Sequence, residues 1–142
     1  MADTSTAKDR PVYRNIHITQ IIKYRLPLAG MVSIGHRISG LLMFLLLPFV
    51  VWLFDVTVTS EISYERFTSA FSAGVGPFAG WFLKIVVLGL IWAYLHHFIA
   101  GIRHLWMDAT HAVSKEFGRK SAVVTLASSL LLTAVLGYKL FF

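Results

Sequence analysis

Cysteine is absent from this sequence, and charged residues are scarce, at 14% of 142 residues. Without thiols the chain forms no disulfide bonds and offers no thiolate ligands to a metal ion or an iron–sulfur cluster. Any metal that it binds must therefore use histidine or arrive inside a cofactor. Soluble domains are about 25% charged, so this composition, with 56% hydrophobic residues, indicates a single integral membrane domain instead.

Familiar catalytic patterns are also missing. The chain has no glycine-rich phosphate loop, no nucleophile elbow and no pair of carboxylates inside an apolar run. The formal net charge of +6 does not indicate a nucleic acid partner, because the Lys and Arg residues flank apolar runs in the manner of a protein embedded in a lipid bilayer. These absences leave electron or proton transfer, in which a bound cofactor carries the chemistry.

Three long apolar runs predict an all-α integral membrane protein with transmembrane helices at about residues 31–56, 78–107 and 121–142. Pro48 lies inside the first run and predicts a bend, because proline cannot donate a hydrogen bond to the carbonyl of Phe44. At about 1.5 Å per residue the second helix is longer than a hydrocarbon core of about 30 Å. We therefore expect this helix to tilt or to project from the bilayer.

The chain divides into a polar and basic head, residues 1–30, and a three-span membrane domain, residues 31–142. We expect a disordered tail over the first ten residues, then an interfacial lead-in that Pro27 interrupts. Within the first loop, three aromatic residues share one helical face and predict a short interfacial helix: Tyr64, Phe67 and Phe71. The first 25 residues contain no apolar stretch of a cleavable signal peptide, and the short head lacks the length and Arg/Ser richness of a transit peptide. These features favour a bacterial inner membrane.

The positions of Lys and Arg predict the orientation of the spans. Five of these residues precede the first span, Arg66 alone lies in the first loop, and three lie in the second loop. Because short cytoplasmic segments carry the excess of positive charge, we expect a cytoplasmic N-terminus and a C-terminus outside. Trp52 and Trp81 then mark the outer interface, and Trp106 marks the inner one. This orientation places the polar clusters of the first two spans at similar depth near the inner face.

The second span carries ionisable residues, which within a membrane indicate a functional site. His97 and His104 are two turns apart on one face, with Gly101 between them. Imidazole is a common axial ligand of b-type haem, and glycine lets a flat macrocycle approach, so the pattern predicts ligation by His97. The alternative is a hydrogen bond from His97 to a neighbouring helix. The second axial ligand comes from His36 or from another subunit, and His96, about 100° away, is interpreted as a polar contact to the lipid interface or a partner helix.

The first span opens with a second polar cluster. Ser33 and Arg37 lie one turn apart on a common stripe, with His36 beside it. The guanidinium of Arg37 suits the carboxylates of haem propionates, and together with the Ser33 hydroxyl it suits a quinone carbonyl. Its alternative role is to reach a lipid phosphate. Asp108, four residues after His104, is expected either to orient that imidazole or to be an exposed acid at a helix end.

Three segments resemble the cytochrome b556 membrane-anchor subunits of succinate dehydrogenase (respiratory complex II). They are Arg10-Pro11, Ser33-Ile34-Gly35-His36-Arg37-Ile38-Ser39-Gly40, and the stretch from His97 through Arg103-His104 to Asp108. The resemblance covers nearly the whole chain in length, number of spans and order of motifs. Two positions depart from the family pattern. His96 adds an imidazole beside the expected ligand, and Gly35 stands where a larger apolar residue is usual.

The resemblance implies a heterodimeric, haem-bridged anchor, in which this chain and a second small three-helix anchor sandwich one haem b. His97 matches the axial histidine on this chain, while the other axial histidine belongs to the partner anchor. His36, Arg37 and His104 match positions near the haem propionates. Ser33 and Arg37 match positions that line the ubiquinone site beside the iron–sulfur subunit.

The same resemblance implies a role in electron transport that accompanies the tricarboxylic acid cycle. Electrons from succinate would pass through the flavoprotein subunit and the iron–sulfur subunit to the quinone. This chain would then supply the quinone pocket and the membrane anchor, without catalysing succinate oxidation itself. Three rival interpretations are the anchor of a quinol:fumarate reductase, a haemless membrane subunit whose His and Arg residues relay protons, and a purely structural anchor.

Overall fold

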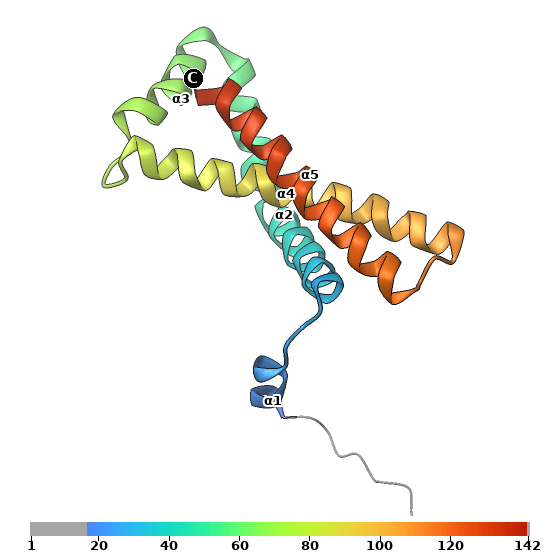
Figure 1. Cartoon of the computed structure of the whole chain (residues 1–142). Helices are drawn as coiled ribbons and strands as arrows, with labels where there is room; N and C mark the ends of the chain where they lie inside the picture. The colour runs from blue at the N-terminus through green and yellow to red at the C-terminus, as the bar shows by residue number, and fades with distance from the viewer. Residues whose placement is uncertain (1–16, 142) are drawn as a thin grey trace, which may run out of the picture.

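The computed structural model describes residues 17–141, and this part of the chain folds into α-helices joined by short connections (Figure 1). The helices are α1 (Ile18–Lys23), α2 (Leu28–Thr59), α3 (Glu61–Ala73), α4 (Gly80–Thr110) and α5 (Lys115–Phe141). The expected N-terminal tail and the Arg10-Pro11 pair lie outside the described residues. Figure 1 shows α1 set apart from the three long helices, which cross one another.

Three helices, α2, α4 and α5, are long and apolar enough to cross a membrane. The prediction of an all-α protein with three spanning helices is thereby confirmed. Each helix extends a few residues past at least one end of its expected span, and the largest difference is at α5, which begins at Lys115. A charged turn precedes the apolar run of α5 and contains an ion pair of 2.7 Å between Lys120 and Glu116. Hydropathy locates the apolar run, whereas the helix continues through this charged turn.

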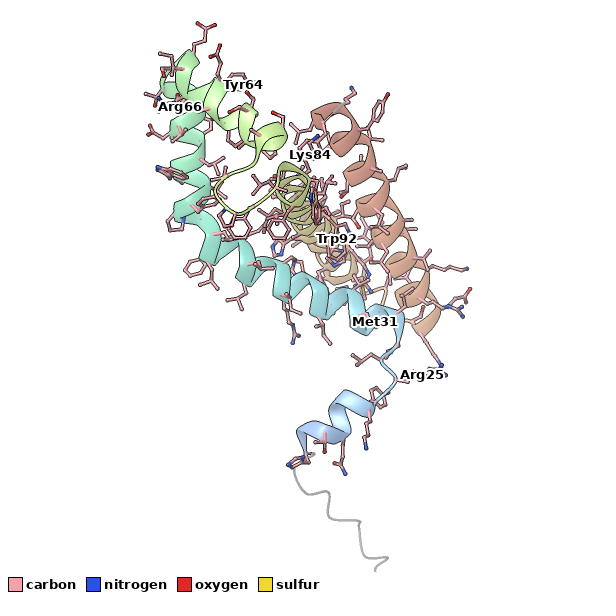
Figure 2. The ribbon with its side chains drawn as sticks, turned by 90° about the vertical axis from the view of Figure 1, so that its left-hand side faces the viewer. Arg25, Met31, Tyr64, Arg66, Lys84 and Trp92 are labelled. Atoms are coloured by element: carbon pink, nitrogen blue, oxygen red, sulfur yellow. The ribbon has the colours of Figure 1, made fainter. Side chains whose placement is uncertain are left out.

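The path of α2 is controlled by two prolines. Pro27 stands immediately before the helix, and its carbonyl accepts hydrogen bonds from the backbone N–H groups of Gly30 and Met31 at 2.9 and 3.1 Å. Pro48 lies inside α2, and the helix continues through it. Figure 2 shows α2 changing direction between the end marked by Met31 and the end that leads to α3. Loss of one backbone hydrogen bond and the steric demand of the Pro48 ring provide the physical cause.

The short helix expected between the first two spans is present as α3. Its N-terminus carries a capping box, in which the Ser60 hydroxyl accepts from the Ser63 backbone N–H and the Ser63 hydroxyl accepts from that of Ser60. Its C-terminus ends at Gly74, whose φ of 87° favours glycine. The ring of Phe71 lies 5.5 Å from that of Phe141 at the end of α5. This contact joins α3 to the same end of the bundle as the C-terminus.

Small residues line the contacts between the long helices, and α4 lies between α2 and α5 (Figure 2). The buried apolar residues of the described chain are Val32, Ala93, Ala100 and Ala122, and Ser129 and Gly137 are buried on α5. Small side chains let helix backbones approach closely, which is how helices associate within lipid. Most large apolar side chains point outward, so the bundle has a thin core and an apolar exterior.

Candidate functional site

The contact between α2 and α4 is formed by two adjacent histidines that lie over two glycines. His96 is only 1% exposed, and its Nε2 atom lies 3.4 Å from the carbonyl oxygen of Val32. A Cβ atom at Gly35 would lie 2.8 Å from that same Nε2. His96 therefore makes the contact to a partner helix that the sequence suggested, and the lack of a side chain at position 35 makes room for its ring.

His97 of α4 contacts α2 one helical turn further along that helix. Its Nδ1 atom lies 2.9 Å from the carbonyl oxygen of His36, and a Cβ at Gly40 would lie 2.8 Å from its Cε1 atom. A carbonyl can only accept, so Nδ1 carries the proton and donates it. In a neutral imidazole the other nitrogen, Nε2, then keeps its lone pair. A hydrogen bond from Nδ1 to a backbone carbonyl is the usual partner of a metal-binding histidine, so His97 is in the form that a ligand requires.

Ser39 adds a third group to this contact. Its hydroxyl donates to the His36 carbonyl at 3.0 Å and lies 3.4 Å from Nδ1 of His97. Ser39 is 4% exposed, so both interactions are shielded from solvent. A role for Ser39 was not predicted from the sequence. Its spacing from His36, three residues or nearly one turn, was the available signal.

Three imidazoles gather at this level of the bundle. The ring of His36 stacks on that of His97, with centroids 4.1 Å apart and an angle of 13° between the planes. The His104 ring lies 5.2 Å from that of His36, tilted by 51°. A Cβ at Gly101 would lie 3.5 Å from Nε2 of His36, an ordinary contact. All three rings are half-buried, so they form an accessible group of nitrogens suited to hydrogen-bond carboxylates.

Ser33 and Arg37 are not part of the imidazole cluster. Ser33 is half-buried and Arg37 is exposed, and neither side chain has a hydrogen bond or ion pair to another described residue. They share a stripe of α2 that adjoins the cluster, because residues three or four apart fall on one helix face. The structure thus brings together His36, His97 and His104, and leaves Ser33 and Arg37 on the neighbouring, accessible face.

Arg103 has a different environment from the other polar residues of α4. Its side chain is buried against α5, where Nε donates to the Ser121 hydroxyl at 2.9 Å and Nη2 donates to the Gly118 carbonyl at 3.4 Å. Arg103 belongs to the sequence motif that follows His97. Spacing alone did not predict that the Arg103 side chain points toward α5. Asp108 is exposed and makes no hydrogen bond to His104 among residues 17–141, so it matches the exposed-acid interpretation.

The histidine side chains at this site suit a metal that is already held in a macrocycle. Within the described residues, no group of three or more His, Cys, Asp or Glu side chains converges on a point where a bare ion would fit. His97 uses Nδ1 for its hydrogen bond and so leaves Nε2 for a ligand bond, and two further imidazoles lie beside it. Haem iron takes imidazole as an axial ligand, and the haem propionates are carboxylates. The residues present therefore fit haem b.

Comparison with known proteins identifies the class. Residues 6–136 match the family described as "Succinate dehydrogenase/Fumarate reductase transmembrane subunit". The chain belongs to this family, as the motifs of the first two spans indicated. It is therefore a membrane-anchor subunit of a succinate dehydrogenase or fumarate reductase, and a multi-pass membrane protein.

Individual relatives narrow the comparison. The chain is 32% identical over 142 residues to the succinate dehydrogenase cytochrome b556 subunit of Paracoccus denitrificans, covering 100% of this chain and 98% of that protein. It is 34% identical over 128 residues to the subunit of the same name from Coxiella burnetii, covering 90% and 94%. The cytochrome b560 subunit of Reclinomonas americana is 25% identical over 127 residues, covering 89% and 83%. These matches confirm the predicted resemblance to cytochrome b556 subunits.

Proposed function

We propose that this chain is the haem b- and ubiquinone-binding membrane anchor of a succinate:quinone oxidoreductase. His97 is the axial ligand that it contributes, and the second axial histidine comes from a second small anchor subunit. His36, Arg37 and His104 contact the haem propionates. The observation that carries the proposal is the 2.9 Å hydrogen bond from Nδ1 of His97 to the His36 carbonyl, because it fixes the ligand form of the imidazole.

Ser33 and Arg37 bind the quinone. A hydroxyl and a guanidinium on one stripe of α2 donate hydrogen bonds to a quinone carbonyl, and they stabilise the negative charge that gathers on this oxygen as electrons arrive. Bound haem would supply one-electron redox chemistry beside this stripe. The iron–sulfur subunit covers the exposed face of Arg37 and receives electrons from the flavoprotein subunit. The site lies at the inner face of a bacterial inner membrane, with the N-terminus in the cytoplasm.

Succinate oxidation is the favoured direction because all three relatives named above are succinate dehydrogenase subunits. The proton-relay alternative would need a line of exchangeable groups through the bundle. In α5 the hydroxyls of Thr125, Ser129 and Thr133 instead donate to carbonyls of their own helix, at 2.9, 3.0 and 2.7 Å. Groups engaged in this way are poor members of a relay, which supports the haem-binding proposal.

The ligand assignment is tested on the whole complex in mild detergent. We expect a dithionite-reduced minus oxidised spectrum with a sharp α-band in the b-type region, and loss of that band in His97→Leu. His96→Leu is the matched control, because His96 is the adjacent imidazole but engages Nε2 with Val32. A complex that contains flavin and the second anchor but shows an unchanged band in His97→Leu would reject His97 as the ligand.

The quinone assignment is tested by separating the two half-reactions. We expect Arg37→Leu to lose most quinone reduction while succinate oxidation with a soluble dye continues, because the soluble subunits are unchanged. Arg66→Leu, an exposed arginine on α3, is the control and should keep both activities. Wild-type quinone turnover in Arg37→Leu would remove this residue from the site, and the quinone that co-purifies distinguishes succinate oxidation from fumarate reduction.

A further inference from the structure

Two residues that the haem and quinone assignments leave unused, Gly35 and His96, are in direct contact. A Cβ at Gly35 would lie 2.8 Å from Nε2 of His96 and 3.4 Å from its Cδ2 atom. These contacts are with the ring of a fully buried imidazole, which has little room to move. The position of His96 therefore depends on glycine at position 35.

The hydrogen bond of His96 falls on a specific peptide unit. Its Nε2 donates to the carbonyl of Val32, and the nitrogen of that same peptide unit belongs to Ser33. One turn later, Nδ1 of His97 donates to the carbonyl of His36, and the nitrogen of that unit belongs to Arg37. The peptide groups that precede the two proposed quinone residues are thus each held by one imidazole of α4.

The two neighbouring histidines consequently have opposite tautomers. His96 carries its proton on Nε2 and His97 carries it on Nδ1, because each of these atoms faces a carbonyl that can only accept. The Nδ1 atom of His96 is buried and has no partner among the described residues, and the ring stacks on Trp92 at 5.2 Å.

We propose that His96 is a positioning residue for the quinone site. It acts through Val32 and fixes the second turn of α2, so that Ser33 stands at a set rotation and depth relative to Arg37. This inference rests on the proposed function, since it assigns His96 to the same quinone stripe. His96 itself touches neither the quinone nor the haem.

The experiment uses the whole complex in membranes and four variants. His96→Leu removes the hydrogen bond, whereas His96→Gln keeps an amide N–H near the position of the imidazole Nε2. Gly35→Ala introduces the Cβ that displaces the ring. Gly89→Ala is the matched control, since a Cβ at this α4 glycine meets nothing within 4 Å. Each variant is assayed for its haem band, dye-linked succinate oxidation, and kcat and KM for a short-chain ubiquinone.

We expect His96→Leu and Gly35→Ala to raise the KM for quinone about three- to tenfold, the range for loss of one ordinary hydrogen bond. Their kcat should change less than about twofold, because the groups that act on the substrate are intact. Haem band and dye activity should equal those of wild type. His96→Gln should recover most of the wild-type KM, and Gly89→Ala should match it.

A purely structural role for His96 predicts a different pattern. Unchanged KM in both His96→Leu and Gly35→Ala, with assembled complex, would overturn the proposal. Equal KM values for His96→Gln and His96→Leu would also overturn it, because the donor would not matter. If Gly35→Ala fails to assemble, the pair of His96 variants decides the question. Failure of the proposed function is separate, because it appears as normal quinone turnover in Arg37→Leu.

Discussion

The two faces of α4 use polar side chains in opposite ways. On the face toward α5, Arg103 is buried and directs its guanidinium to Ser121 and Gly118, so its hydrogen bonds are made within the chain. On the face toward α2, His97 uses one nitrogen to contact the other helix and keeps Nε2 available. Both faces hold helices together, but only the face toward α2 keeps a histidine nitrogen that can bind a ligand.

This difference separates the polar residues that bind from those that stabilise. An ionisable residue in a membrane helix indicates function by default, yet Arg103 illustrates the other outcome, because its side chain is engaged by α5. The useful distinction is whether a polar atom remains without a hydrogen-bond partner after the helices have packed. Among the accessible groups of α2 and α4, such capacity lies at Nε2 of His97, on the half-buried rings of His36 and His104, and on Ser33 and exposed Arg37.

The largest effect is expected from closing the space beneath His97. In Gly40→Leu, the new side chain would begin 2.8 Å from Cε1 of His97 and would push the ring from its hydrogen bond to the His36 carbonyl. Mutation of groups that orient a metal ligand typically weakens metal affinity about 10- to 100-fold. We expect most haem to be lost on gel filtration of the complex. Gly89→Leu, at an open position of α4, should retain haem.

A smaller effect, on stability alone, is expected from the α5 face. Ser121→Ala removes the hydroxyl that accepts from Nε of Arg103 and should destabilise the helix pair by about 1–2 kcal/mol. This change should lower the apparent Tm of the complex by a few degrees and leave the haem spectrum intact. Ser128→Ala is the control, because the Ser128 hydroxyl donates to the Val124 carbonyl of its own helix. A spectral change in Ser121→Ala would show that the two faces are coupled.

The smallest effect is expected from Ser39→Ala. The variant loses the hydroxyl that lies 3.4 Å from Nδ1 of His97, while the shorter bond from Nδ1 to the His36 carbonyl persists. Loss of one such interaction corresponds to about 0.5–1.5 kcal/mol, so haem retention should fall by less than about tenfold. Ser33→Ala provides the contrast, with reduced quinone turnover and full haem. Complete haem loss in Ser39→Ala would mean that the hydroxyl, rather than the carbonyl, orients His97.

Much of the fold could be predicted from the sequence because hydropathy and length specify spanning helices directly. The runs that became α2, α4 and α5 were evident, and Pro27, expected to interrupt the lead-in, stands immediately before α2. The start of α5 was harder to predict, because the charged turn from Lys115 to Lys120 resembles a loop in the sequence.

The gathering of His36, His97 and His104 followed from an argument about depth in the membrane. Their detailed contacts did not, because the rotation of one helix against another is decided by packing. Spacing along α4 placed His97 and Arg103 in a single motif, whereas the structure directs one toward α2 and the other toward α5. The contact of His96 with Gly35 likewise depends on the register between two helices, which a single sequence does not encode in any local pattern.

The thin core of the bundle has a consequence for the turnover of the chain in the cell. Large apolar side chains such as Phe44 and Leu105 are 74% and 71% exposed, while the buried apolar residues of the described chain are one valine and three alanines. Lipid can cover part of this surface, and the iron–sulfur subunit that we propose would cover the exposed side chain of Arg37. A newly made copy without this companion would lack the stability that binding adds, and less stable proteins are degraded sooner in cells. The abundance of this chain should therefore follow the supply of its companions more closely than the rate of its own synthesis.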